Sequence, residues 1–355
     1  MSKIRIDQDC IFIIVTDLHL WSKNIANRKN YTKECIYNMT QLQIVVKKVL
    51  QKKKPSQKVY IVFLGDVFHH GEPSPTEYNN WVQVFTVLRA LVNGMFAVVG
   101  NHEITYEVDN PFWGLVSEIK SPQLLRRGLQ PKGSLPIINL VDHIDVFDTR
   151  LHFNHFNTNI YDVVPTENIL FAHNYWATEG ILKSYEKQLD EKALKRYSKG
   201  SIITETSPIR FFKHCFFGHN HLIYGDFQVG WKSDIYDDTQ LHYLGSFGLT
   251  KRNEVLKSGG YRKFAILTVN QNGSSLEFEE VKLIGSRDVL DRETIAEIES
   301  IKKLEEEIEI EINSCILDDL DPIENLRQKY INMPELSQML EALLEGDIPA
   351  WLKLV

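Results

Sequence analysis

Short apolar runs alternate with longer amphipathic segments in the first 100 residues of the chain. The runs at 11–16, 59–64 and 95–99 are rich in β-branched and aromatic residues, a composition typical of buried strands. The segments at 34–51 and 79–92 carry apolar residues at helical spacing. This alternation predicts a mainly parallel central sheet covered by helices.

The pattern between residues 104 and 283 is less regular. Five prolines interrupt residues 104–168, so we expect loops there, with a short helix near 113–120 and strands near 137–156. The remaining expected elements are buried strands at 169–172 and 214–217, a helix with a basic face at 179–199, and antiparallel strands at 222–229, 240–246, 260–269 and 275–283.

The composition indicates a globular intracellular protein. Of 355 residues, 43% are hydrophobic, which is enough for a sizeable packed core. The chain has no apolar run of ~18 residues that would span a membrane and no N-terminal signal sequence, so we expect a cytoplasmic location. Its four cysteines are scattered without a C-x-x-C pair, which argues against a disulfide framework or a thiolate zinc site.

Charge divides the chain into two regions. Fourteen acidic and three basic residues between Asp288 and Glu324 give this segment a charge of −11, whereas residues 1–287 carry +5. We therefore expect one large domain at 1–285 and a separate acidic region at 286–355. The basic body suits an anionic substrate, although the acidic run can equally be a solvated helix face.

Five predicted strands each lead into residues of the types that bind metals. In chain order these residues are Asp17 and His19, Asp66, Asn101, His173, and His219 and His221. Ligands of open α/β sheets bind at the carboxyl ends of the strands, so these side chains should converge. Asp-x-His and His-x-His place both side chains of a pair on one side of an extended segment. Glycines at 65, 100 and 218 allow the backbone to turn and approach closely there.

The chemistry of this residue set favours two metal ions. Carboxylate, amide oxygen and imidazole together suit divalent ions such as manganese, iron or zinc. A central carboxylate can bridge two ions, and Asp66 is the natural candidate. Two metals roughly 3.5–4 Å apart clamp a phosphate and activate a water for in-line attack. The set therefore predicts phosphoester hydrolysis.

The order of these motifs resembles the calcineurin-like metallophosphoesterase superfamily. It runs D-x-H, G-D, G-N-H-E, a strand-final His and G-H-x-H between residues 17 and 221. The resemblance implies a four-layer α/β/β/α sandwich with a small C-terminal α/β or helical region. It implies one metal ion on Asp17, His19, Asp66 and His221, and a second on Asp66, Asn101, His173 and His219. It also implies that His102 protonates the leaving oxygen or stabilises the transition state.

His173 is the ligand with the most competitors. His143, His152, His155 and His214 offer the same side chain. His173 is preferred because the Ile-Leu-Phe-Ala run before it is similar to the other ligand-bearing strands.

The second motif distinguishes branches of the superfamily. Protein phosphatases carry an arginine shortly after it, in G-D-x-V-D-R-G, whereas this chain has Gly65-Asp66-Val67-Phe68-His69 and no arginine there. G-D-x-F-H resembles the SbcD and meiotic-recombination-eleven type of DNA double-strand-break nuclease, in which this histidine assists with the phosphate. His69 takes that role by the match, and the alternative is a loop residue without a role. Glu103 departs from the nuclease pattern, which usually has Asp, and matches the phosphatase branch.

Segments at 242–246 and 259–264 are also similar to this nuclease branch, so the resemblance covers about residues 9–285. It implies a DNA exonuclease or endonuclease subunit for double-strand-break processing or recombination, with Mn²⁺ as the metal. It implies a homodimer and an SbcC-type coiled-coil ATPase bound through the 286–355 region, although the helices predicted at 322–345 can equally pack on their own core.

The length is similar to compact phage recombination endonuclease subunits, which act in the host cytoplasm. A phosphatase or small-molecule phosphodiesterase with the same metal site, and a non-catalytic scaffold, are the alternatives.

Overall fold

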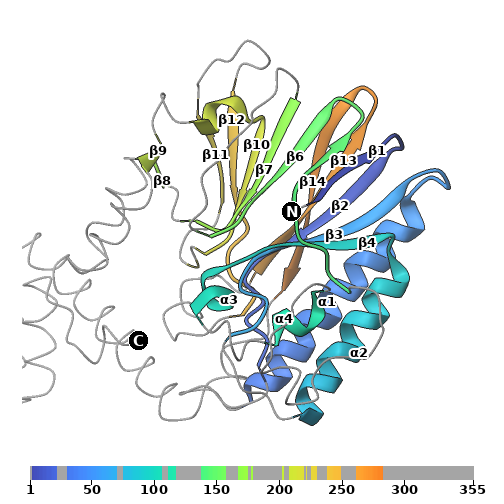
Figure 1. The fold of residues 1–355 in the computed structure, drawn as a ribbon, viewed down its shortest axis with the longest axis vertical. Coiled ribbons are helices and arrows are strands. Elements are labelled where there is room, and N and C mark those ends of the chain that lie inside the picture. Colours follow the sequence, from blue (N-terminus) through green and yellow to red (C-terminus); the bar gives the residue numbers. More distant parts are fainter. Residues whose placement is uncertain are drawn as a thin grey trace, which may run out of the picture.

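The computed structural model describes the parts of the chain that form the body of the fold (Figure 1). The described residues are 2–21, 30–69, 75–105, 111–116, 137–156, 167–174, 177–178, 202–203, 208–219, 221, 225–229, 238–248 and 261–282. The acidic region predicted at 286–355, with its domain boundary, and the basic helix predicted at 179–199 lie outside them.

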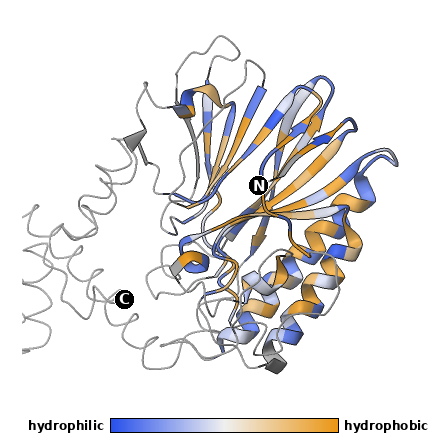
Figure 2. Cartoon of the chain, viewed as in Figure 1, coloured by the Kyte–Doolittle hydropathy of each residue, from blue (hydrophilic) through white to orange (hydrophobic). Residues whose placement is uncertain are grey.

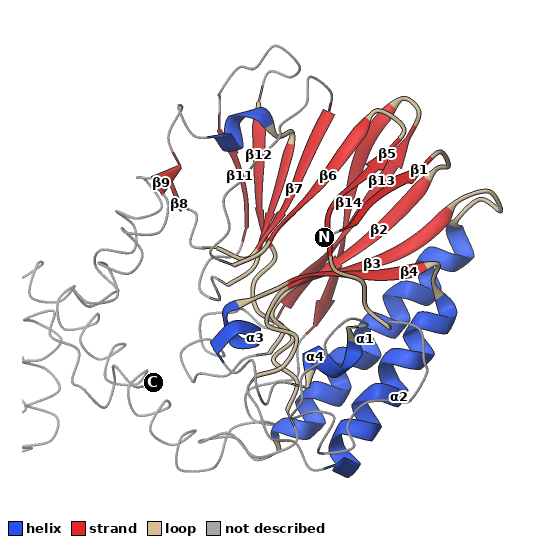
Figure 3. Cartoon of the chain, viewed as in Figure 1, coloured by secondary structure: helices blue, strands red, loops and turns tan. Residues whose placement is uncertain are grey.

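Two β-sheets face each other (Figures 1 and 3). The first consists of β2 (Cys10–Val15), β3 (Lys58–Leu64), β4 (Gly94–Val98), β13 (Tyr261–Asn270) and β14 (Gly273–Lys282), in the order β14-β13-β2-β3-β4. The second consists of β1 (Ser2–Ile6), β5 (Val141–Val146), β6 (Thr149–Asn154), β7 (Glu167–Ala172), β10 (His214–Phe217), β11 (Gly225–Val229) and β12 (Thr239–Tyr243), in the order β1-β5-β6-β7-β10-β12-β11. A separate parallel pair is formed by β8 (Ala177–Thr178) and β9 (Ile202–Ile203).

Alternate residues of β2 enter two different cores. Phe12 and Ile14 belong to the apolar cluster between the two sheets. Ile11, Ile13 and Val15 belong to the cluster beneath the helices. Every residue of β2 is therefore buried, as expected for a strand covered on both faces, and this explains its continuous apolar run.

Helices α1 (Tyr31–Lys52) and α2 (Pro75–Leu91) cover the outer face of the first sheet, and hydrophobic residues run along these strands and helices (Figure 2). The side chain of Asn30 caps α1 by accepting the N–H of Lys33 at 3.0 Å.

The short elements are α3 (Asn101–Thr105), α4 (Phe112–Leu115) and the 3-10 helix η1 (Pro208–Phe211). Among the described residues, no helix combines the length and apolar character needed to cross a membrane. The predicted α/β sandwich of two sheets is confirmed.

The sequence pattern missed one strand and did not predict how the last strands divide between the sheets. The sequence pattern did not indicate β1, whose only apolar residues are Ile4 and Ile6, because a short edge strand with charged residues gives little signal. Residues 222–283 were predicted to form antiparallel strands, and β11 does pair antiparallel with β12, as β13 does with β14. The two pairs belong to different sheets, however, and β12 also pairs parallel to β10. Strand direction depends on long-range connections that local periodicity does not record.

Two buried histidines of the second sheet make the fold sensitive to acid. Nε2 of His152 lies 3.0 Å from Oδ1 of Asn168, and Nδ1 of His214 lies 3.1 Å from Nε2 of His242. Burial lowers the pKa of His152 to about 4, and burial followed by the effect of His242 lowers that of His214 to about 3. The folded protein keeps both neutral, while the unfolded chain takes up protons below pH ~6.5, so stability decreases as the pH falls from 6.5 towards 4.

We expect His152→Gln to reduce this acid sensitivity. The glutamine amide can donate to Asn168 in the same way and does not titrate. Free energies of unfolding would be measured with urea at pH 7 and pH 5. Between these values the native protein should lose about 1–2 kcal/mol more than the variant. Equal losses in the two proteins would contradict the assignment of a neutral buried His152.

Candidate metal centre

The candidate ligands follow the carboxyl ends of strands in both sheets. Strands β2, β3 and β4 of the first sheet lead to Asp17, Asp66 and Asn101, while β7 and β10 of the second lead to His173 and His219. The sequence predicted one sheet edge for all five strands, and the structure corrects this to two. The two edges are in direct contact, since the backbone N–H of His219 donates to the Asp17 carboxylate at 3.1 Å.

A first group consists of Asp17, His19, Asp66 and His221, with one ligand atom of each within 4.8 Å of the others. Nε2 of His221 lies 2.9 Å from Nε2 of His19 and 3.3 Å from Oδ1 of Asp17. Burial, and then the neighbouring His221, lower the pKa of His19 well below its usual value. His19 is therefore neutral, the form that binds a metal.

A second group consists of Asp66, His173 and His219, whose ligand atoms also lie within 4.8 Å of one another. Asn101 joins this group because its Oδ1 lies 3.0 Å from Nε2 of His173. The rings of His173 and His219 meet at 5.0 Å between centroids. The structure thus brings together all seven residues that the sequence singled out, in the two sets that the resemblance implied.

Asp66 is shared by the two groups and is 1% exposed. Its Oδ2 lies 3.4 Å from Nε2 of His173 and 3.9 Å from Nε2 of His19. Its Oδ1 accepts the backbone N–H of His102 at 2.9 Å, which fixes the orientation of the carboxylate. A carboxylate in this position can bridge two cations.

His173 is held so that one ring nitrogen faces the cluster. Its Nδ1–H donates to the carbonyl of Leu64 at 2.5 Å, while Nε2 is directed at Asp66. Metal-binding histidines have this arrangement, with the second nitrogen bonded to a backbone carbonyl or a carboxylate. Burial alone would lower the pKa of His173, but Asp66 raises it to about 9, so a cation between the two would replace a proton.

The four competing histidines lie elsewhere. His143 and His152 are on β5 and β6, His214 pairs with His242, and Nδ1 of His155 accepts the N–H of Val99. Within the described residues, neither group around Asp66 contains any of the four.

Four of the candidate ligands have a left-handed backbone. The φ angle is 46° at Asp17, 44° at His19, 47° at Asp66 and 73° at His219. For residues other than glycine, such conformations cost of order 1–3 kcal/mol each and gather at functional sites. They also correct the interpretation of Asp-x-His: both side chains reach one group because the loop is turned, not because the segment is extended.

Glycine is required at two points where backbone segments pack closely against the ring of His173. Gly65 has a φ of 82°, and a Cβ at Gly65 or at Gly218 would overlap Nδ1 of the His173 ring. A larger residue at either position would push this ring away from the carbonyl of Leu64 that orients it. The predicted close approach at these glycines is confirmed.

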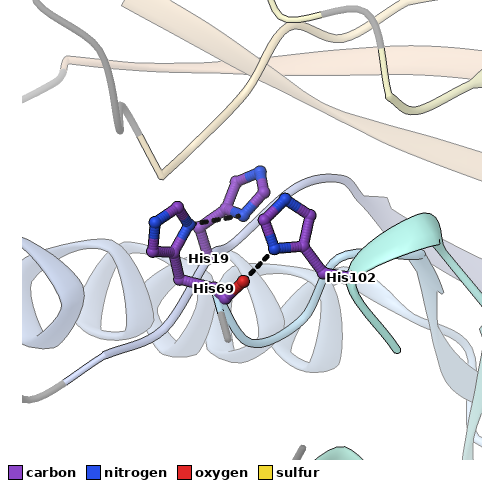
Figure 4. A group of neighbouring side chains, drawn as sticks. All are labelled: His19, His69 and His102. Carbon is purple, nitrogen blue, oxygen red and sulfur yellow. Dashed lines mark hydrogen bonds between the residues drawn. The ribbon is translucent and has the colours of Figure 1, made fainter. Parts of the chain in front are cut away.

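His19, His69 and His102 form a third group of imidazoles beside the first (Figure 4). Nδ1 of His102 donates to the backbone carbonyl of His69, which leaves Nε2 on the side of Asp66, at 3.8 Å from Oδ2. The rings of His69 and His102 stack at 5.1 Å between centroids, and Nδ1 of His69 lies 3.5 Å from Nδ1 of His19. Burial lowers the pKa of His102, although Asp66 opposes this. Both residues predicted to take part in catalysis therefore lie beside the candidate ligands.

Several supporting residues gave no functional signal in the sequence. The hydroxyl of Tyr31 donates to the carbonyl of His19 at 2.9 Å. The Ser246 hydroxyl lies 3.2 Å from the carbonyl of Asp17, and the buried Arg262 donates from Nε to the carbonyl of Ser246 at 2.6 Å. In the sequence, the segments around Ser246 and Arg262 show only a resemblance to the nuclease branch. The structure shows that they brace the loop of Asp17.

Glu103 is a buried carboxylate that contacts the backbone of Asp66. Burial, and then the charge of Asp66, raise the pKa of Glu103 to about 8, while the backbone N–H groups of Gly100 and Asp66 oppose the rise. A cation bound by Asp66 would offset the charge of that residue and favour the ionised form of Glu103.

The donor set fits divalent cations. Each of the two groups around Asp66 combines carboxylate oxygen with imidazole nitrogen, and the second adds the amide oxygen of Asn101. In the part of the chain that the structure describes, clusters of this kind occur only where these two sheet edges meet.

A family model decides the classification. The model of the calcineurin-like phosphoesterases matches residues 11–222, which span both groups of candidate ligands. The chain belongs to this family. As a calcineurin-like phosphoesterase with these donor groups, it is a hydrolase with a divalent metal site. Among proteins with curated descriptions, none matches the chain significantly.

Solved structures similar to this calcineurin-like phosphoesterase have low sequence identity to it. A 5'-nucleotidase precursor from Thermus thermophilus is 11% identical, with a TM-score of 0.33 over 78% of this chain and 54% of that one. Vacuolar Protein Sorting 29 from Cryptosporidium parvum is 11% identical, with a TM-score of 0.29 over 78% of this chain and 100% of that one. A cold-active protein-tyrosine phosphatase of a Shewanella species is 11% identical, with a TM-score of 0.32 over 80% and 83%. The chain spans about half the length of the nucleotidase precursor.

Proposed function

We propose that this calcineurin-like phosphoesterase is a two-metal phosphodiesterase that cleaves DNA. The observation that carries the proposal is the position of His69, which follows Gly65-Asp66 as in SbcD-type nucleases and whose ring lies against His102 and His19. The arginine that marks the protein phosphatases does not occur in residues 65–72. An imidazole at this place, beside His19 of the first candidate metal group, can contact an oxygen of a bound diester.

The side chains of the site have distinct roles in this proposal. When bound, two divalent ions would clamp the phosphate and activate a water for in-line attack. Asp66 would hold both ions, since it belongs to both groups. His102 would protonate the leaving 3′ oxygen from Nε2, because its Nδ1–H is bonded to the carbonyl of His69. His69 would orient the phosphate.

The proposal extends to the metal and the partners. The metal is Mn²⁺, which suits a mixed oxygen and nitrogen donor set. The chain works as a homodimer in the cytoplasm with an SbcC-type coiled-coil ATPase, in double-strand-break processing or recombination. Charge supports this arrangement, because residues 1–287 carry +5 and suit DNA. The acidic stretch that begins at Asp288 would repel DNA and so remains available for a protein partner.

A comparison of substrates tests the proposal. With Mn²⁺, the purified protein should cleave linear DNA and bis-nitrophenyl phosphate faster than nitrophenyl phosphate. His69→Ala should lower the rate on both diesters by about tenfold or more, the effect of losing ~1.4 kcal/mol in the transition state. His143→Ala is the matched control, because this histidine lies on β5, outside the three imidazole and carboxylate groups.

The result that would overturn the proposal is rapid hydrolysis of the monoester without action on DNA. It would identify a phosphatase, the second candidate, which is favoured by Glu103 because the phosphatase branch carries glutamate at this position.

A further inference from the structure

Glu103 is a fully buried carboxylate in the candidate metal centre that is not among the candidate ligands. It lies on α3, two residues after Asn101, and is 0% exposed. A buried carboxylate has to be stabilised by hydrogen bonds, so its partners show what it does.

Both oxygens of Glu103 accept backbone N–H groups, and these come from two separate loops. Oε2 accepts from Gly100 at 2.8 Å and from Asp66 at 2.9 Å, while Oε1 accepts from Val67 at 2.9 Å. One side chain thus joins the loop after β3, which carries Asp66, to the turn at Gly100, which leads from β4 to Asn101 at the start of α3. Trp113 anchors the short helix in turn, because its Nε1–H donates to the carbonyl of Glu103 at 3.0 Å.

The local backbone depends on these bonds. The left-handed conformation of Asp66 is unfavourable by itself, and the bond from its own N–H to Glu103 stabilises it. Gly100 lets the carboxylate approach, since a Cβ there would lie 2.8 Å from Oε2. The length of the side chain also matters, because aspartate is one methylene shorter and cannot reach both loops in the same position.

We propose that Glu103 is a positioning residue that fixes the spacing between Asp66 and Asn101 and thereby sets how tightly their group binds its ion. The inference rests on the proposed function, because it assumes that these residues bind metal. Asp66 and Asn101 meet at His173, whose Nε2 lies 3.4 Å from Oδ2 of Asp66 and 3.0 Å from Oδ1 of Asn101. A shift of either loop would separate these ligand atoms. Contacts that orient metal ligands typically change metal affinity 10–100-fold.

The test compares Glu103→Gln and Glu103→Asp with a matched control. Glutamine keeps the length but sets an N–H₂ group against at least one of the three N–H donors, and aspartate keeps the carboxyl group but shortens the reach. Glu167→Gln is the control, since Oε1 of Glu167 also accepts a backbone N–H, from Ser274 at 3.1 Å, at the end of β7 remote from His173. Mn²⁺ binding to the metal-free proteins would be measured by calorimetry, and circular dichroism would confirm that each is folded.

We expect both Glu103 variants to bind at least one of two Mn²⁺ ions 10–100-fold more weakly than the native protein. Excess Mn²⁺ should restore most of kcat for bis-nitrophenyl phosphate without a change in KM, which separates positioning from a catalytic role. Glu167→Gln should behave as the native protein.

Native Mn²⁺ affinity in a folded Glu103 variant would overturn the inference. So would a loss of folding in both variants, since Glu103 would then serve the fold rather than the ligand spacing. A native protein that binds no Mn²⁺ would instead refute the proposed function, so the two failures are distinguishable.

Discussion

Replacing Asp66 with asparagine should abolish both metal binding and hydrolysis. Oδ2 of Asp66 lies within 3.9 Å of ring nitrogens of His19, His173 and His102, so one oxygen serves both groups. The other oxygen is needed by the N–H of His102, so the amide N–H₂ of asparagine would point at the place of the cations. We expect the rate on a diester to fall at least ~10³-fold, equivalent to ~4 kcal/mol of transition-state stabilisation.

Metal content and rate should fall together in this variant. Elemental analysis after saturation with Mn²⁺ would give the ions bound per chain, beside the rate on bis-nitrophenyl phosphate. Asp145→Asn is the matched control, because Asp145 lies on β5 and is bonded to Arg150 at 2.6 Å. An Asp66→Asn protein that retains two ions per chain would show that Asp66 does not bridge them.

The residues of the site could be predicted from the sequence more fully than their geometry. Asp17, Asp66 and His173 each follow a buried apolar run, and that pattern is local. Their convergence from two sheets depends on the parallel pairing of β7, β10 and β12, which leaves no mark in the local pattern. The turned backbone of Asp17 and His19 could not be predicted either, since Asp-x-His is equally compatible with an extended strand.

The residues that support the ligands escaped prediction for a different physical reason. Glu103 and Ser246 act on backbone groups, and backbone groups are the same at every position of a sequence. Arg262 occurs in a strand segment and is charged, so its residue type favours exposure, yet it is 1% exposed. Such contacts are specified by the complete fold. The ligands, in contrast, are specified by residue type and spacing.

Replacing His102 with alanine should separate chemistry from metal binding. His102 belongs to neither group of ligands around Asp66, so the variant should bind Mn²⁺ with native stoichiometry. The Nδ1–H of His102 is bonded to the carbonyl of His69, so Nε2 is the nitrogen that can carry a proton to the substrate. Loss of a general acid typically costs 10²–10⁴-fold in rate, and we expect a decrease of about this size on DNA.

The leaving group decides how large the effect of His102→Ala is. The 3′ oxygen of DNA leaves as a poor, strongly basic alkoxide unless it is protonated, whereas nitrophenolate leaves without a proton. If His102 is the acid, the variant should lose far more activity on DNA than on bis-nitrophenyl phosphate. An equal loss on both substrates would mean that His102 stabilises charge on the phosphate rather than protonating the leaving oxygen. Full activity on DNA would remove His102 from the mechanism.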